Sequence, residues 1–161
     1  MTETIGISAI SGRRRWTMLV CSMVAAMTTT CVVSGVAYLI PALHTDVGLS
    51  IPEASTLAAV PTVGLMIAII PWGALLDRYG ERLILTISLS ITLIGAVATA
   101  FTTLGDASLW AIGVCLFVGG LGSGAANGAS GRIVVGWFPA DQRGTAMGFR
   151  QMAQPLGVAL G

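Results

Sequence analysis

Few side chains in this sequence could take part in chemistry, and most of these are arginines and carboxylates. The 161 residues include eight Lys or Arg, all of them Arg, with seven Asp or Glu, one His and a net charge of +1. His44 has no nucleophile arranged around it, and Cys21, Cys31 and Cys115 lie inside apolar runs without metal-ligand spacing. A phosphate-binding loop ends in Gly-Lys, and the chain has no Lys. The sequence therefore predicts no enzyme activity, no cofactor or metal, and no nucleic-acid partner.

One arginine inside an apolar run is expected to have a structural role. Arg132 precedes Phe138 by six residues, which is about 9 Å along a helix at 1.5 Å per residue. An apolar run of this length is expected to cross a membrane. A long side chain about 9 Å from the end of the run can extend its charged group to the lipid–water interface. It can also pair with Asp77 or Glu81, which are expected near the same interface.

A second arginine starts a short polar stripe. Arg150 is followed by Gln151, and Gln154 lies one helical turn further on the same face. Asn127 is the one amide in the preceding apolar run, where it could join two helices or face a cavity. Two interpretations of Arg150 stay open: an interface anchor, or a cation that attracts an anionic solute such as a small organic acid. We take these four residues as candidates for a substrate pathway.

The composition indicates an all-α integral membrane protein. One expected partner is therefore the lipid bilayer that surrounds the helices. Hydrophobic residues make up 55% of the chain and charged residues 9%, whereas soluble domains carry about 25% charged residues. Residues 1–15 are expected to form a polar tail, and the apolar run after it is too long for a signal peptide. The expected transmembrane bundle, residues 16–161, has spans near 16–40, 54–76, 83–103 and 109–137, with a partial span at 146–161. Loops are expected at Pro41–Pro52 and Pro139–Thr145.

The arginines predict the orientation of these spans. Arg13–Arg15, Arg78, Arg82 and Arg143 fall on one side of the expected membrane. The loops on the other side contain no Arg. By the positive-inside rule, the N-terminus is expected in the cytoplasm and the protein in the cell membrane.

The polar hairpin between the second and third expected spans resembles the signature loop of the major facilitator superfamily (MFS). That signature combines glycines, an Asp-Arg pair and basic residues at fixed spacing, and its matches here are Gly73, Leu75, Asp77, Arg78, Gly80, Arg82 and Leu85. Leu76 and Glu81 depart from it, in place of a small and a basic residue. A generic positive-inside loop would explain the arginines, but it would not explain the glycines and the aspartate at these spacings.

Other stretches agree with the family or limit what it implies. Gly136–Gly148 resembles the family's usual link between spans four and five. The arginine that many relatives carry early in span four is missing near Leu116, which puts proton coupling in doubt. Residues 154–157 do not fit the fifth-span motif of drug antiporters, which disfavours a multidrug exporter.

The resemblance implies an MFS-type helical bundle and a secondary carrier of a small solute that works by alternating access. Family members have two six-helix halves, and the substrate binds between them. The chain is therefore expected to be the N-terminal half only, incomplete in span five, to lack the C-terminal half of the carrier, and not to transport alone. Gly73, Asp77, Arg78, Gly80 and Arg82 are expected to form a latch for one conformational state. The alternative is a non-transporting membrane polypeptide that only associates with other helices.

The fourth expected span is rich in glycine. Gly120, Gly124 and Gly128 recur every four residues, so they share one helix face. In a membrane such a face allows another backbone to approach closely. We expect these three glycines to serve helix packing, although a substrate pathway beside them is the other interpretation.

Overall fold

The structure is a computed structural model that describes residues 11–46, 48–104 and 108–161. All of its secondary structure in these ranges is helical, which confirms the predicted all-α class. The long helices are α2 (Gly12–Tyr38), α4 (Ile51–Tyr79), α5 (Glu81–Leu104) and α6 (Leu109–Trp137). The short helices are α3 (Ile40–Thr45), α7 (Ala140–Gln151) and α8 (Ala153–Leu160).

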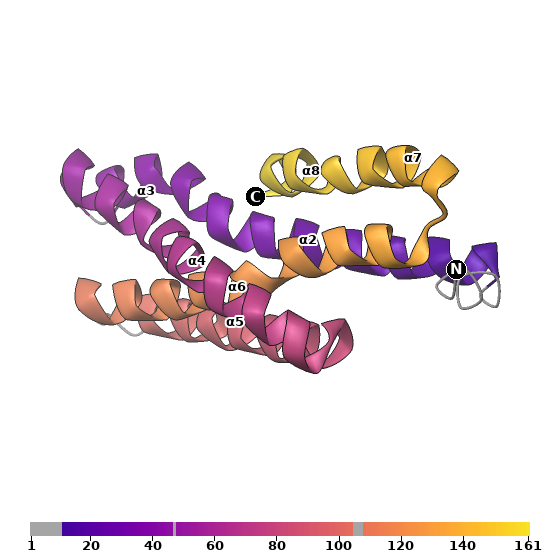
Figure 1. The fold of residues 1–161 in the computed structure, drawn as a ribbon. Helices are drawn as coiled ribbons and strands as arrows, with labels where there is room; N and C mark the ends of the chain where they lie inside the picture. The colour runs from indigo at the N-terminus through magenta and orange to yellow at the C-terminus, as the bar shows by residue number, and fades with distance from the viewer. Residues whose placement is uncertain (1–10, 47, 105–107) are drawn as a thin grey trace.

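The helices are arranged around α6 (Figure 1). This helix packs extensively against both α4 and α5 and also against α2, while α8 lies along α2. Four segments are long and apolar enough to cross a membrane: residues 12–45, 51–79, 81–104 and 109–137. The central one, α6, is the most buried of the four. The chain is thus an all-α, multi-pass membrane bundle.

The boundaries of α4 follow from its end residues. Ser50 caps the helix, because its hydroxyl accepts the Glu53 backbone N–H and the Glu53 carboxylate accepts the Ser50 backbone N–H. Pro52 lies in the first turn, where its missing N–H costs no hydrogen bond. The helix ends at Tyr79, and its C-cap is Gly80, whose φ of 80° is a conformation that favours glycine.

Three expected irregular segments are partly helical in the structure. The tail expected to extend to residue 15 ends earlier, because α2 begins at Gly12; residues 1–10 lie outside the described residues. The expected Pro41–Pro52 loop contains α3, and the expected Pro139–Thr145 loop is replaced by α7 from Ala140 onward. Pro41 lies in the first turn of α3, where its fixed φ favours the helix, and Pro139 is the N-cap of α7.

The expected fifth span consists of two helices that are joined at Met152. Pro155 has no N–H to donate to the Gln151 carbonyl, and its ring crowds that carbonyl. The helix is therefore interrupted at Met152, between α7 and α8. Pro61 and Pro71 act differently, since α4 continues through both of them.

Candidate functional site

The first candidate site is a charge network where α4, α5 and α6 meet. The Arg132 guanidinium of α6 donates a hydrogen bond to the Asp77 carboxylate near the end of α4. Its Nε atom also lies 3.6 Å from Oε1 of Glu81, the first residue of α5. The Arg132 and Asp77 side chains are 43% and 70% exposed. Arg132 thus connects the hairpin to the central helix, and this confirms the pairing expected from its position in the sequence.

The other hairpin residues are not part of this network. The Arg78 guanidinium lies 5.5 Å from the ring centroid of its neighbour Tyr79, and Arg82 is exposed. Within the described residues, neither arginine makes an ion pair. Gly80 forms the turn, whereas a Cβ added to Gly73 would meet nothing within 4 Å. Of the five residues expected to form a latch, the structure places Asp77 in direct contact with a charged partner.

The second candidate site is the half-buried guanidinium of Arg150, where α7 lies against α6. Nε donates to the Ser130 hydroxyl at 2.8 Å, and one terminal nitrogen donates to the Asn127 carbonyl at 2.7 Å. The other terminal nitrogen lies 3.4 Å from the Gln151 side-chain oxygen and 3.7 Å from the Met147 sulfur. All of these acceptors are neutral. Within the described ranges, no carboxylate pairs with Arg150.

The remaining polar candidates differ in their relation to Arg150. Gln151 contacts the guanidinium directly, and Asn127 contributes its backbone carbonyl. Gln154 is exposed on α8 beyond the helix break. The structure therefore brings together Arg150, Gln151 and the Asn127 backbone, while Gln154 makes no described contact with them.

The glycine face of α6 is covered by α4. A Cβ added at Gly120 would lie 2.7 Å from the Pro61 carbonyl carbon, and one at Gly124 would lie 2.8 Å from Cδ1 of Trp72. Gly128 is less confined, because its nearest neighbour would be Leu76 Cδ1 at 3.2 Å. The face that could have served association with other chains is thus occupied by a helix of the same chain.

Several packing residues were not identified from the sequence. Gly64 and Gly95 approach α6 as closely as the singled-out glycines, with added Cβ atoms 2.5 Å from backbone atoms of α6. Trp72 Nε1 donates to the Leu121 carbonyl at 2.7 Å, and the Ser88 hydroxyl donates to the Gly122 carbonyl at 2.5 Å. The sequence could have identified Trp72 and Ser88, because both are hydrogen-bond donors inside apolar runs. In a membrane such donors must find acceptors within the protein.

The family assignment rests on sequence comparison. The sequence model of the Major Facilitator Superfamily matches residues 18–161. An uncharacterized MFS-type transporter of Mycobacterium tuberculosis is 43% identical over 147 residues, which cover 91% of this chain and 32% of the relative. The chain therefore belongs to the Major Facilitator Superfamily. No solved structure matches it.

Two further relatives have names that specify a solute. The probable L-galactonate transporter of Escherichia coli is 31% identical over 73% of this chain and 25% of its own length. The hexuronate transporter of Bacillus subtilis is 32% identical over 74% of this chain and 28% of its own length. The chain thus spans about a third or less of the length of these relatives.

Proposed function

We propose that this chain belongs to a secondary carrier that moves a small organic anion across the cell membrane by alternating access. The observation that carries this proposal is the environment of Arg150. Its charge is held between two helices by a hydroxyl, a backbone carbonyl and a side-chain amide, without a carboxylate among the described residues. A solute carboxylate would supply the missing negative charge.

The energetics support a functional role for this arginine. Arg150 lies about one turn inside the expected fifth span, and charged residues within membrane spans are costly and often mark a transport pathway. Neutral acceptors orient the guanidinium but leave its positive charge uncompensated. Hydrogen bonds from a guanidinium to a carboxylate are about twice as strong as neutral ones. The site is therefore suited to an anion, and a cationic solute would be repelled.

The names of the relatives agree with this substrate class. L-galactonate and hexuronate are carboxylate anions, and a third relative is a probable anion transporter of Arabidopsis thaliana. The amide side chains of Asn127, Gln151 and Gln154 could hydrogen-bond to other polar groups of such a solute. These similarities support the class of solute and do not select one compound.

The charge network is the second part of the proposal. In a carrier of two halves, the Asp77–Arg132–Glu81 contacts would hold the hairpin in position for one alternating state. Arg78 and Arg82, which are exposed, would be available to the half of the carrier that the chain does not supply. With the N-terminus in the cytoplasm, this network would lie at the cytoplasmic end of the bundle.

Uptake of radiolabelled solutes by the complete carrier tests the proposal. We expect organic anions to be transported, Arg150→Gln to raise the KM for the anion at least tenfold, and Arg150→Lys to restore part of the affinity. Arg14→Gln, which removes an exposed arginine near the N-terminus, is the matched control and should leave the KM unchanged. Transport of cationic or neutral solutes only, or an unchanged KM in Arg150→Gln, would refute the anion site.

A further inference from the structure

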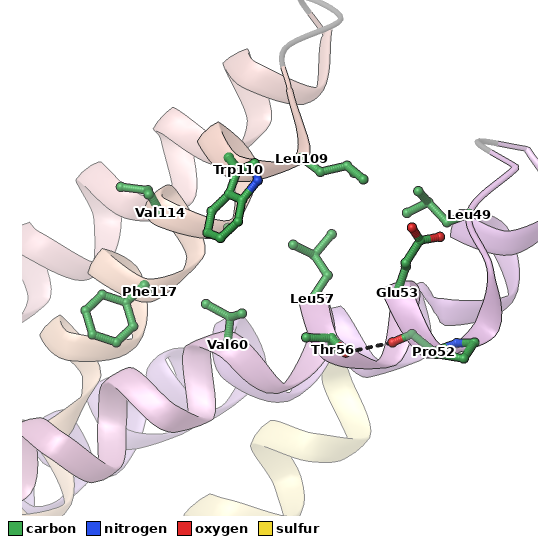
Figure 2. A pocket seen from close by; sticks show the side chains of 11 residues that line it. Leu49, Pro52, Glu53, Thr56, Leu57, Val60, Leu109, Trp110, Val114 and Phe117 are labelled. Carbon is green, nitrogen blue, oxygen red and sulfur yellow. Dashed lines mark hydrogen bonds between the residues drawn. The ribbon is translucent and has the colours of Figure 1, made fainter.

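A groove between α4 and α6 lies at the opposite end of α4 from the charge network (Figure 2). It has a volume of about 540 Å³, within the range of about 300–1,000 Å³ that is usual for ligand pockets. Leu57 and Val60 of α4 form one wall, and Trp110, Val114 and Phe117 of α6 form the other. The walls are apolar along their length, so the groove suits a hydrocarbon chain.

The groove starts where both helices start. Ser50 is the N-cap of α4 and Ser108 is the N-cap of α6, so these two helix ends lie together near one membrane interface. From Glu53 to Val60 the groove extends about 10 Å along α4, at 1.5 Å per residue. It therefore runs from the interface toward the middle of the bilayer. This is the course that an acyl chain takes below its headgroup.

Among the described residues that line the groove, Glu53 is the one with a charged side chain, and it lies at the interface end. The Glu53 carboxylate uses one oxygen, Oε2, to accept from the Ser50 backbone N–H at 2.9 Å and from the Ser50 hydroxyl at 2.6 Å. Within the described residues, its other oxygen has no hydrogen-bond partner. Trp110, which is 86% exposed, lies across the groove, and an indole ring attracts ammonium groups. None of the described residues that line the groove is basic, so no positive side chain there would repel an ammonium group.

From this arrangement we propose that the α4–α6 groove binds a bilayer phospholipid with a primary-amine headgroup. The acyl chain lies between Leu57 and Phe117, and the ammonium group pairs with Glu53 beside Trp110. The binding site is separate from Arg150 and from the charge network. The inference does not depend on the transported solute.

Native mass spectrometry of the delipidated protein tests this inference, with phosphatidylethanolamine and phosphatidylglycerol of identical acyl chains as probes. We expect the amine lipid to be retained at least fivefold better than the anionic lipid. Glu53→Gln should abolish that preference. A glutamine at this position can still accept the Ser50 N–H, so the helix cap is retained. Asp46→Asn, which removes an exposed carboxylate that does not line the groove, is the control and should keep the preference.

A second measurement locates the lipid. Phosphatidylethanolamine with a brominated acyl chain should quench the fluorescence of Trp110, measured as the difference between the parent protein and Trp110→Phe. Glu53→Gln should reduce that quenching, and Asp46→Asn should not. Equal retention of the two lipids by the parent, a preference that survives in Glu53→Gln, or no quenching of Trp110 would each overturn the proposal.

Discussion

The Arg132 guanidinium of α6 donates directly to the Asp77 carboxylate of α4, across 55 residues of sequence. The same guanidinium lies 3.6 Å from Glu81, so one arginine contacts carboxylates on both sides of the Gly80 turn. Because both partners are substantially exposed, the ion pair is expected to contribute little to stability, about 0.2–1 kcal/mol. Its position between three helices is better suited to holding the hairpin in one arrangement.

Asp77→Asn should therefore impair transport by the complete carrier much more than it impairs membrane insertion. We expect at least a tenfold loss of uptake rate with membrane levels near those of the parent. Arg132→Gln should give a similar loss, and the double variant should be no worse than either single one, because all three remove the same contact. Uptake assays with immunoblotting of the membrane fraction measure both quantities. Normal uptake by the Asp77→Asn variant would indicate that the hairpin charges determine only the orientation of the spans in the membrane.

The orientation of the bundle gives a second prediction. In a background with Cys21, Cys31 and Cys115 replaced by alanine, a cysteine at Asp46 or at Asp106 should react with an impermeant maleimide added outside the cell. A cysteine at Asp141 should react only after the cells are opened. The reason is the one-sided placement of the arginines. If cysteines at Asp46 and Asp106 reacted only from the cytoplasm, the bundle would have the opposite orientation.

The sequence predicted features that depend on local pattern. Apolar runs long enough to span a bilayer appear as the four long helices. The distance of Arg132 from the end of its helix was enough to predict its carboxylate partners. Features that depend on how two helices meet were not predictable in this way. The acceptors of Arg150 include a hydroxyl 20 residues away and a backbone carbonyl 23 residues away. Likewise, nothing in the local pattern showed that Gly64 and Gly95 face α6.

The Ser88 hydroxyl offers a test of one such unpredicted contact. It is fully buried and donates to the Gly122 carbonyl of α6 at 2.5 Å. Ser88→Ala should lower the stability of the bundle by about 0.6 kcal/mol, the average for hydrogen bonds between membrane helices. Ser90→Ala is the matched control, because the exposed Ser90 hydroxyl bonds to Thr86 within its own helix. Denaturant unfolding in detergent micelles should show a loss for Ser88→Ala alone, and equal effects of the two changes would contradict the assigned contact.

Because α4 lies close to α6 at Gly120, even the methyl group of alanine at this position should destabilise the bundle. A methyl group there would lie 2.7 Å from both the carbonyl carbon and the Cα of Pro61, and these backbone atoms cannot rotate away. Gly120→Ala should therefore push the two helices apart and lower stability by about 1–3 kcal/mol. Gly136→Ala is the control in the same helix, since its methyl group would meet nothing within 4 Å. That change should be neutral or stabilising by up to about 1 kcal/mol, because alanine favours the helix over glycine. A melting temperature for Gly120→Ala equal to that of Gly136→Ala would show that the two backbones are not in contact.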